Sequence, residues 1–147
     1  MNYWLFQCNP KLYRIEDRLN DPNPKITWKV SRYQNEIKCG DIAFIWRAGD
    51  ERGVVGAMRL QSDPHLMREI ESELPFRIGE GEYEEEKQIM VKAELIARTN
   101  LPADELRTVR ELKRLSLLHP PYQGTNFRVS QTEGRMLMEL IGGQKNA

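Results

Sequence analysis

The stretch of residues 42–60, IAFIWRAGDERGVVGAMRL, decides the fold class. Residues 42–47 are an apolar run that predicts a strand, and residues 54–60 predict the strand that returns beside it. Between them, residues 48–53 combine glycines with charged side chains, which is typical of a hairpin loop. Gly56 in the return strand indicates a bulge or a close backbone approach. Strands joined in this way run antiparallel.

Strand patterns also lie outside this hairpin. Residues 3–8 are aromatic and apolar and end at an Asn-Pro turn, and residues 88–98 predict the longest strand. Residues 26–30 and 125–129 predict two short extended segments. This hairpin-rich order favours an antiparallel curved sheet or barrel of about five or six strands over a parallel sheet.

Helical patterns are shorter and lie between the strands. Residues 12–19 space their apolar side chains at helical intervals, and a helix is expected from Leu101-Pro102 to about residue 115. Residues 130–133, Ser-Gln-Thr-Glu, have the pattern of a capping box for a closing helix over residues 136–141. The expected fold class is therefore α+β, with helices packed outside the sheet.

The composition favours one soluble domain spanning residues 1–147, with 39% hydrophobic and 30% charged residues. No apolar run approaches the ~20 residues of a membrane span, and residues 1–19 lack the features of a signal peptide, so a cytoplasmic protein is expected. Cys8 and Cys39 are predicted to be reduced packing residues. The cysteines and histidines show no metal-ligand spacing, so neither a metal nor another cofactor is predicted.

Charge is balanced overall but unevenly distributed. The 22 basic residues match the 22 acidic ones, which argues against a protein that coats nucleic acid by charge alone. Residues 1–60 and 107–147 are nevertheless more basic than acidic, whereas residues 61–106 are acidic. This distribution permits a basic face built from both ends of the chain. Two solvated faces without a partner remain the alternative.

An ordered set of motifs resembles the EVE domain family of the PUA-like superfamily, which is related to YTH domains. The motifs are YWLFQCNP at residues 3–10, ITWKVSRY at 26–33, IKCGDIAFIWRAG at 37–49 and GVVG at 53–56, with a weaker match in YQGTNF at 122–127. The match is to a W-x-V-x-R-Y form. The resemblance implies a PUA-like β-barrel flanked by helices and a pocket for an extruded nucleotide. It also implies a modified base, such as methylated or hydroxymethylated cytosine or N-methylated adenine.

A base reader needs a flat aromatic wall and hydrogen-bonding groups at the base edge. Trp28 is the candidate for the wall, because its neighbours are polar and would cover a core tryptophan poorly; it is also where the family places its stacking aromatic. Trp46 could face it across the pocket or pack in the core, and Tyr33 could close the pocket or anchor a turn. The remaining candidates supply the base edge and are Asn9, Ser31 and the backbones of Lys29 and Val30.

Phosphate contacts require cations beside the pocket. The candidates are Lys11, Arg32 and Arg47, with Lys29 in a second role. Each is equally interpretable as a solvated surface charge.

The leading hypothesis is a non-catalytic reader of modified DNA bases. An RNA-binding PUA-like module and a protein-interaction domain of a restriction or RNA-modification system are the alternatives. No nucleotide-binding or hydrolase motif is present, and an enzyme would have to use a carboxylate from residues 80–86. A separately encoded nuclease or translocase is a further candidate partner.

Overall fold

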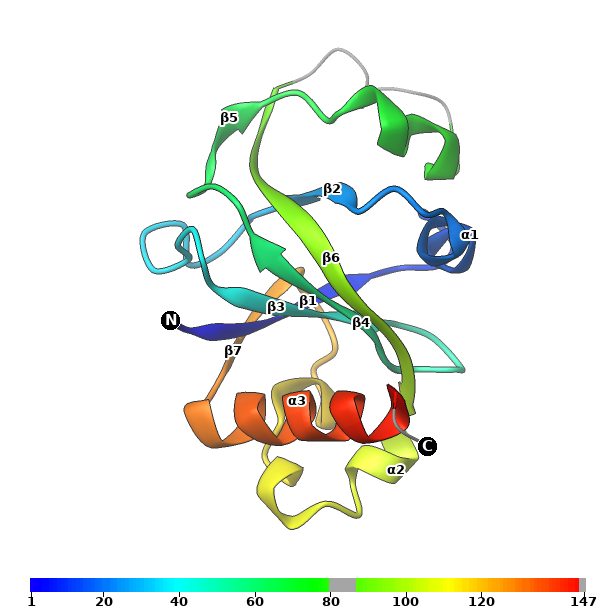
Figure 1. The fold of residues 1–147 in the computed structure, drawn as a ribbon, viewed down its shortest axis with the longest axis vertical. Helices are drawn as coiled ribbons and strands as arrows, with labels where there is room; N and C mark the ends of the chain where they lie inside the picture. The colour runs from blue at the N-terminus through cyan, green and yellow to red at the C-terminus, as the bar shows by residue number, and fades with distance from the viewer. Residues whose placement is uncertain (80–86, 146–147) are drawn as a thin grey trace.

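The computed structural model describes residues 1–79 and 87–145 of the chain (Figure 1). The elements follow in this order: β1 (Tyr3–Cys8), α1 (Ile15–Asn20), β2 (Lys25–Lys29), β3 (Ile42–Arg47), β4 (Gly53–Leu60), β5 (His65–Met67), the 3-10 helix η1 (Glu71–Phe76), β6 (Gln88–Pro102), α2 (Ala103–Leu106), the 3-10 helices η2 (Arg110–Leu112) and η3 (Ser116–Leu118), β7 (Asn126–Val129) and α3 (Gln131–Lys145). The α+β prediction is confirmed.

One sheet holds every strand of the described residues, in the order β2-β6-β4-β3-β1-β7, with β5 paired to β6. It has seven strands, one or two more than expected. All strand pairs are antiparallel except that of β1 with β3, which is parallel. The register of the predicted hairpin shifts between Ile45, which pairs with Gly56, and Trp46, which pairs with Val54, so the irregularity lies beside the glycine that indicated a bulge.

The sheet is strongly curved. In a flat sheet, β2 and β1 would lie about 19 Å apart, because three strands separate them at about 4.8 Å per step. The rings of Phe6 on β1 and Trp28 on β2 nevertheless lie 6.3 Å apart, so the sheet curls until its interior side chains meet. The side chain of Asn126, on the opposite edge strand β7, donates to Lys29 O at 3.1 Å and thereby joins the two edges.

Alternation along the strands divides the core into two clusters. Side chains inside the curve pack with α1, and Trp4, Phe6 and Trp28 belong to this interior cluster. Side chains on the outer face pack beneath α3 and residues 103–118, which lie together below the sheet in Figure 1. Tyr3 and Trp46 belong to this outer cluster. No helix among the described residues is both long enough and apolar enough to cross a membrane.

Two helix predictions differ from the structure. Strand β6 continues to Pro102 because that residue pairs with Gly53 of β4, so the predicted helix from residue 101 is reduced to α2 and two 3-10 turns. The capping box is confirmed, since Ser130 N donates to Glu133 Oε1 at 2.8 Å and Glu133 N donates to Ser130 Oγ at 3.1 Å. Helix α3 is longer than predicted and continues through Gly142 and Gly143, although each glycine in a helix costs roughly 1 kcal/mol.

Candidate functional site

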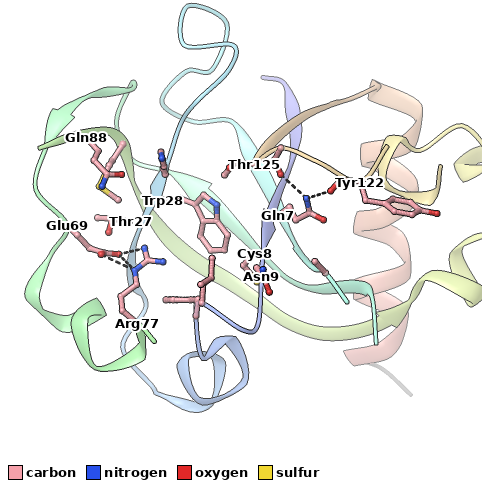
Figure 2. A pocket seen from close by; sticks show the side chains of 16 residues that line it. Gln7, Cys8, Asn9, Thr27, Trp28, Glu69, Arg77, Gln88, Tyr122 and Thr125 are labelled. Atoms are coloured by element: carbon pink, nitrogen blue, oxygen red, sulfur yellow. Dashed lines mark hydrogen bonds and ion pairs between the residues drawn. The ribbon is translucent and has the colours of Figure 1, made fainter. Parts of the chain in front are cut away.

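A cavity of about 330 Å³ opens where the ends of β1 and β2 meet β6 (Figure 2). Its walls come from six segments of the sequence, including residues 69–77 and 122–125. The cavity is lined by Gln7, Cys8, Asn9, Leu12, Tyr13, Thr27, Trp28, Lys29, Ala48, Glu69, Arg77, Gln88, Met90, Tyr122, Gly124 and Thr125. Its volume is at the small end of the ~300–1,000 Å³ range of ligand sites, which suits a single planar group.

The aromatic wall of the cavity is Trp28, which lies at the centre of the lining side chains in Figure 2. Its ring packs 6.3 Å from Phe6 and meets Tyr13 edge-on at 6.1 Å. Only 6% of the residue is exposed, so the expectation that its polar neighbours would leave it poorly covered is wrong. Trp28 is therefore both a core residue and a cavity wall.

Two lining residues carry buried oxygen atoms without a hydrogen-bond partner in the described part of the chain. These atoms are Thr27 Oγ1 and Gln7 Oε1. The amide nitrogen of Gln7 donates to the carbonyls of Tyr122 and Gly124, each at 2.8 Å, which ties the 122–124 segment to β1. A buried hydroxyl or carbonyl oxygen without a partner is costly, so a ligand group that reached either atom would add little further desolvation cost.

An ion pair of Glu69 and Arg77 forms the side of the cavity that lies away from Gln7 and Tyr122 (Figure 2). Arg77 Nε donates to both carboxylate oxygens, at 3.1 and 3.0 Å, and Nη2 also contacts Glu69. Burial lowers the pKa of Arg77, but hydrogen bonds to Glu69 outweigh that effect and raise it. The guanidinium lies 4.7 Å over the ring of Tyr13, so this wall is fixed in place.

Behind this wall lies a second, fully buried ion pair. Arg18 Nε donates to Glu73 Oε2 at 2.9 Å, and both side chains are only 1% exposed. Tyr13 donates its hydroxyl to the same oxygen at 3.0 Å. Burial raises the pKa of Glu73, opposed by the charge of Arg18, and it also raises the pKa of Tyr13, so the phenol keeps its proton.

Three of the predicted base-binding residues line the cavity, namely Asn9, Trp28 and Lys29. Asn9 also has its structural role, because its Oδ1 accepts Lys11 N at 3.0 Å within the turn. Trp46 does not face Trp28 and is corrected to a core residue: it is 1% exposed and belongs to the outer cluster beneath α3. Its position on β3 directs it away from the interior of the curve.

The other predicted base contacts also lie outside the cavity lining. Val30 is 2% exposed in the interior cluster, and its N–H is already satisfied by Ile89 O at 2.9 Å. Ser31 and Tyr33 lie beyond the end of β2, where Ser31 N donates to Asn126 Oδ1 at 2.8 Å. Neither side chain is among those that line the cavity.

The predicted phosphate-binding cations are dispersed. Lys11 is exposed beside the cavity rim, and Arg32 is exposed beyond β2. The side chain of Arg47 is 13% exposed and pairs with Glu16 at 2.5 Å and with Glu51 at 3.8 Å. Residues 80–86, the proposed source of a catalytic carboxylate, lie outside the described residues.

Cysteine reactivity provides a first test of the cavity lining. Burial raises the pKa of the Cys8 thiol to about 12, although the charges of Arg47 and Arg77 oppose this shift. Both cysteines are free, but Cys39 is exposed rather than packed as expected. Because the thiolate is the reactive form, iodoacetamide at pH 8 should modify Cys39 and leave Cys8 intact. Peptide mass spectrometry measures both sites, and equal labelling of the folded protein would contradict the buried position of Cys8.

Solved structures share this fold. A hypothetical protein from Leishmania major is 21% identical, with a TM-score of 0.64 over 99% of this chain and 97% of that one. The human THYN1 protein, solved in complex with 5-methylcytosine-containing DNA, is 17% identical, with a TM-score of 0.65 over 95% and 97%. The Mmi1 YTH domain, solved in complex with RNA, is 12% identical, with a TM-score of 0.58 over 96% and 77%. The likeness to these three structures shows that the chain shares their fold.

The chain belongs to the EVE domain family, because the family model matches residues 2–140. The resemblance seen in the sequence motifs is confirmed. No curated protein matches the chain at a significant level.

Proposed function

We propose that this chain is a non-catalytic nucleic-acid-binding module that holds one flipped, modified base in the cavity beside Trp28. The observation that carries the proposal is the combination of an aromatic wall with the unpartnered buried oxygens of Gln7 and Thr27 in one small cavity. Stacking on an aromatic side chain contributes roughly 1–3 kcal/mol per base. The polar atoms can meet the edge of the base, where a modification is distinguished.

The energetics favour a base that leaves its stack easily. Extruding a base from a duplex costs a few kcal/mol, and the cost is least for a weakly paired or single-stranded base. Stacking on Trp28 and hydrogen bonds to Thr27 or Gln7 would offset that cost without any chemical step. Modified DNA is the first partner to test, since the human THYN1 structure contains 5-methylcytosine DNA; RNA is the second, since the Mmi1 structure contains RNA.

Binding to labelled oligonucleotides tests the proposal directly. Duplexes with one 5-methylcytosine, 5-hydroxymethylcytosine or N6-methyladenine are titrated by fluorescence anisotropy beside unmodified duplexes, together with methylated and unmethylated single-stranded RNA. The proposal requires tighter binding to at least one modified probe. Incubating the same probes and analysing them for base release or strand cleavage tests the enzyme alternative. Absence of binding to every probe would favour the protein-interaction alternative.

Thr27→Val separates ligand binding from stability. Valine keeps the shape of the side chain and removes the unpartnered hydroxyl, so the free energy of unfolding should rise by about 1 kcal/mol. Affinity for the preferred probe should fall by about 2- to 12-fold, the equivalent of one net hydrogen bond. Urea unfolding and anisotropy measure the two quantities on the same variant.

Ser116→Ala is the matched control for this variant. Ser116 Oγ is also buried without a partner in the described residues, but it lies in η3 and does not line the cavity. This variant should also gain stability and bind as the parent does. A Thr27→Val protein that keeps the parent affinity for every probe would remove Thr27 from the binding site.

A further inference from the structure

A second cluster of aromatic and basic side chains lies outside the cavity, where the chain leaves β2. Two guanidinium groups lie over the ring of Tyr33, that of Arg32 at 5.0 Å and that of Arg128 at 4.5 Å from its centroid. Arg32 Nη2 also donates to the Tyr33 hydroxyl at 3.2 Å. We call this group the Arg32–Tyr33–Arg128 stack.

The stack is built outward from the core. Tyr33 packs on the ring of Trp4 at 5.4 Å, and Arg128 lies 5.9 Å over the same indole. Trp4 is 1% exposed, and its Nε1 donates to Asp41 Oδ2 at 2.9 Å. Tyr33 itself has a φ of 61°, a left-handed conformation that is uncommon for a large side chain and that the surrounding contacts must hold. The two cations are therefore presented in fixed positions.

The charge of the stack is available to a ligand. Arg32 is exposed, and no carboxylate in residues 1–79 or 87–145 lies within ion-pair distance of it. Arg128 is 60% exposed and meets Glu36 at 3.4 Å. An exposed pair of this kind contributes little, so a phosphate can replace Glu36 as the partner of Arg128. Arginine suits that exchange because its planar guanidinium forms bidentate hydrogen bonds with phosphate.

The stack and the cavity are parts of one structural unit. Strand β2 supplies Trp28 and Lys29 to the cavity, and the chain that follows it supplies Arg32 and Tyr33 to the stack. The segment around β7 likewise supplies Thr125 to the cavity and Arg128 to the stack.

The side chain of Asn126, which is fully buried, joins these two segments. Its Oδ1 accepts Ser31 N at 2.8 Å and Arg32 N at 3.4 Å, while its Nδ2 donates to Lys29 O at 3.1 Å. Cavity and stack therefore keep a fixed relative position.

Arg32 follows Trp28 by four positions, which limits the distance between their Cα atoms to about 14 Å even in fully extended chain. A stacked nucleic-acid strand advances about 3.4 Å per nucleotide, so this distance corresponds to at most about four nucleotides. We propose that the Arg32–Tyr33–Arg128 stack binds the phosphates that flank the base held in the cavity. This inference rests on the proposed function, because it assigns the stack to the same bound strand.

Salt-dependent binding of the full chain tests the inference. Arg32→Gln and Arg128→Gln are titrated singly and together against a 12-nucleotide modified probe and its unmodified counterpart, from 50 to 200 mM salt. The parent slope of log affinity against log salt is expected at about −2 to −4, and each lost phosphate contact should reduce its magnitude by about 0.7–0.9. At 0.1 M salt, relative to 1 M, this slope change corresponds to about a 5- to 8-fold loss of affinity per variant.

The pattern of the losses distinguishes the stack from the cavity. The arginine variants should weaken modified and unmodified probes equally and leave their affinity ratio unchanged, since phosphates carry no base information. Arg110→Ala is the matched charge control, because Arg110 is 89% exposed on η2 and belongs to neither site. Thermal melts of all variants establish that each is folded at the temperature of the titration.

The possible negative results distinguish failure of the phosphate-binding role from failure of the proposed function. A parent that binds the modified probe, with arginine variants of unchanged slope and affinity, would overturn the stack and leave the cavity proposal intact. Variants that lose the preference for the modified base while keeping the slope would also overturn the phosphate role. A parent that binds no oligonucleotide at all would overturn the proposed function together with the stack.

Discussion

Trp28→Ala is expected to destabilise the protein and to weaken binding of the modified probe at the same time. Removing a buried tryptophan that packs on Phe6 and Tyr13 costs about 3–5 kcal/mol, which lowers the melting temperature by roughly 6–20 °C in a domain of this size. The loss of the stacking surface should reduce affinity by about 5- to 150-fold, equivalent to 1–3 kcal/mol. Urea unfolding and anisotropy are measured where the variant remains folded.

Two control variants separate these effects. Ile26 lies on the same strand in the same interior cluster and is 1% exposed, but it does not line the cavity. Ile26→Ala should therefore lose about 2–5 kcal/mol of stability and keep the parent affinity. Trp28→Phe retains an aromatic face and should bind more tightly than Trp28→Ala. If Trp28→Ala, while folded, prefers the modified probe as strongly as the parent does, Trp28 is a core residue only.

The sheet could be predicted from the sequence because its strands carry local signals. The pattern at residues 3–8 gave the observed bounds of β1, and the hairpin of residues 42–60 was correct to within one residue at each strand. The helix expected from residue 101 failed for a tertiary reason, the pairing of Gly53 with Pro102. A cross-strand partner 49 positions away leaves no trace in a local pattern.

Of the residues that line the cavity, the sequence predicted only residues that lie within a family motif. The motifs at residues 3–10 and 26–33 contain Asn9, Trp28 and Lys29, which line the cavity. Glu69 and Arg77 were missed because their segment has no sequence signal for a pocket and reaches the site only through the fold. Thr27 and Gln7 were missed because an unpartnered oxygen is a property of the packed structure.

The buried pair of Arg18 and Glu73 provides the second large expected effect. Each single replacement, Arg18→Met or Glu73→Met, removes one member of a pair that is 1% exposed on both sides. The remaining member then has to be buried without its partner, which costs about 3–5 kcal/mol in either variant. Urea unfolding measures both losses.

The double variant Arg18→Met/Glu73→Met should recover most of that loss. Arg18 Nη1 and Glu73 Oε1 have no hydrogen-bond partner in the described residues, so the pair is only partly satisfied. Replacing a buried ion pair with apolar side chains of similar volume is often neutral or stabilising, because the desolvation cost disappears with the charges. A strongly favourable coupling energy in this double-mutant cycle is the expected result. Additive losses in the double variant would contradict it.

The same cycle shows whether the ion pair shapes the binding cavity. Glu73 holds η1 against α1 and accepts the hydroxyl of Tyr13, which packs edge-on against Trp28. Each single variant should therefore also weaken binding of the modified probe, because the wall formed by Tyr13 and Arg77 shifts when the charge is left unpaired. The double variant should regain affinity together with stability. If stability recovers but affinity does not, the Glu73 carboxylate positions Tyr13 through its hydrogen bond, and the charge of Arg18 serves only to neutralise it.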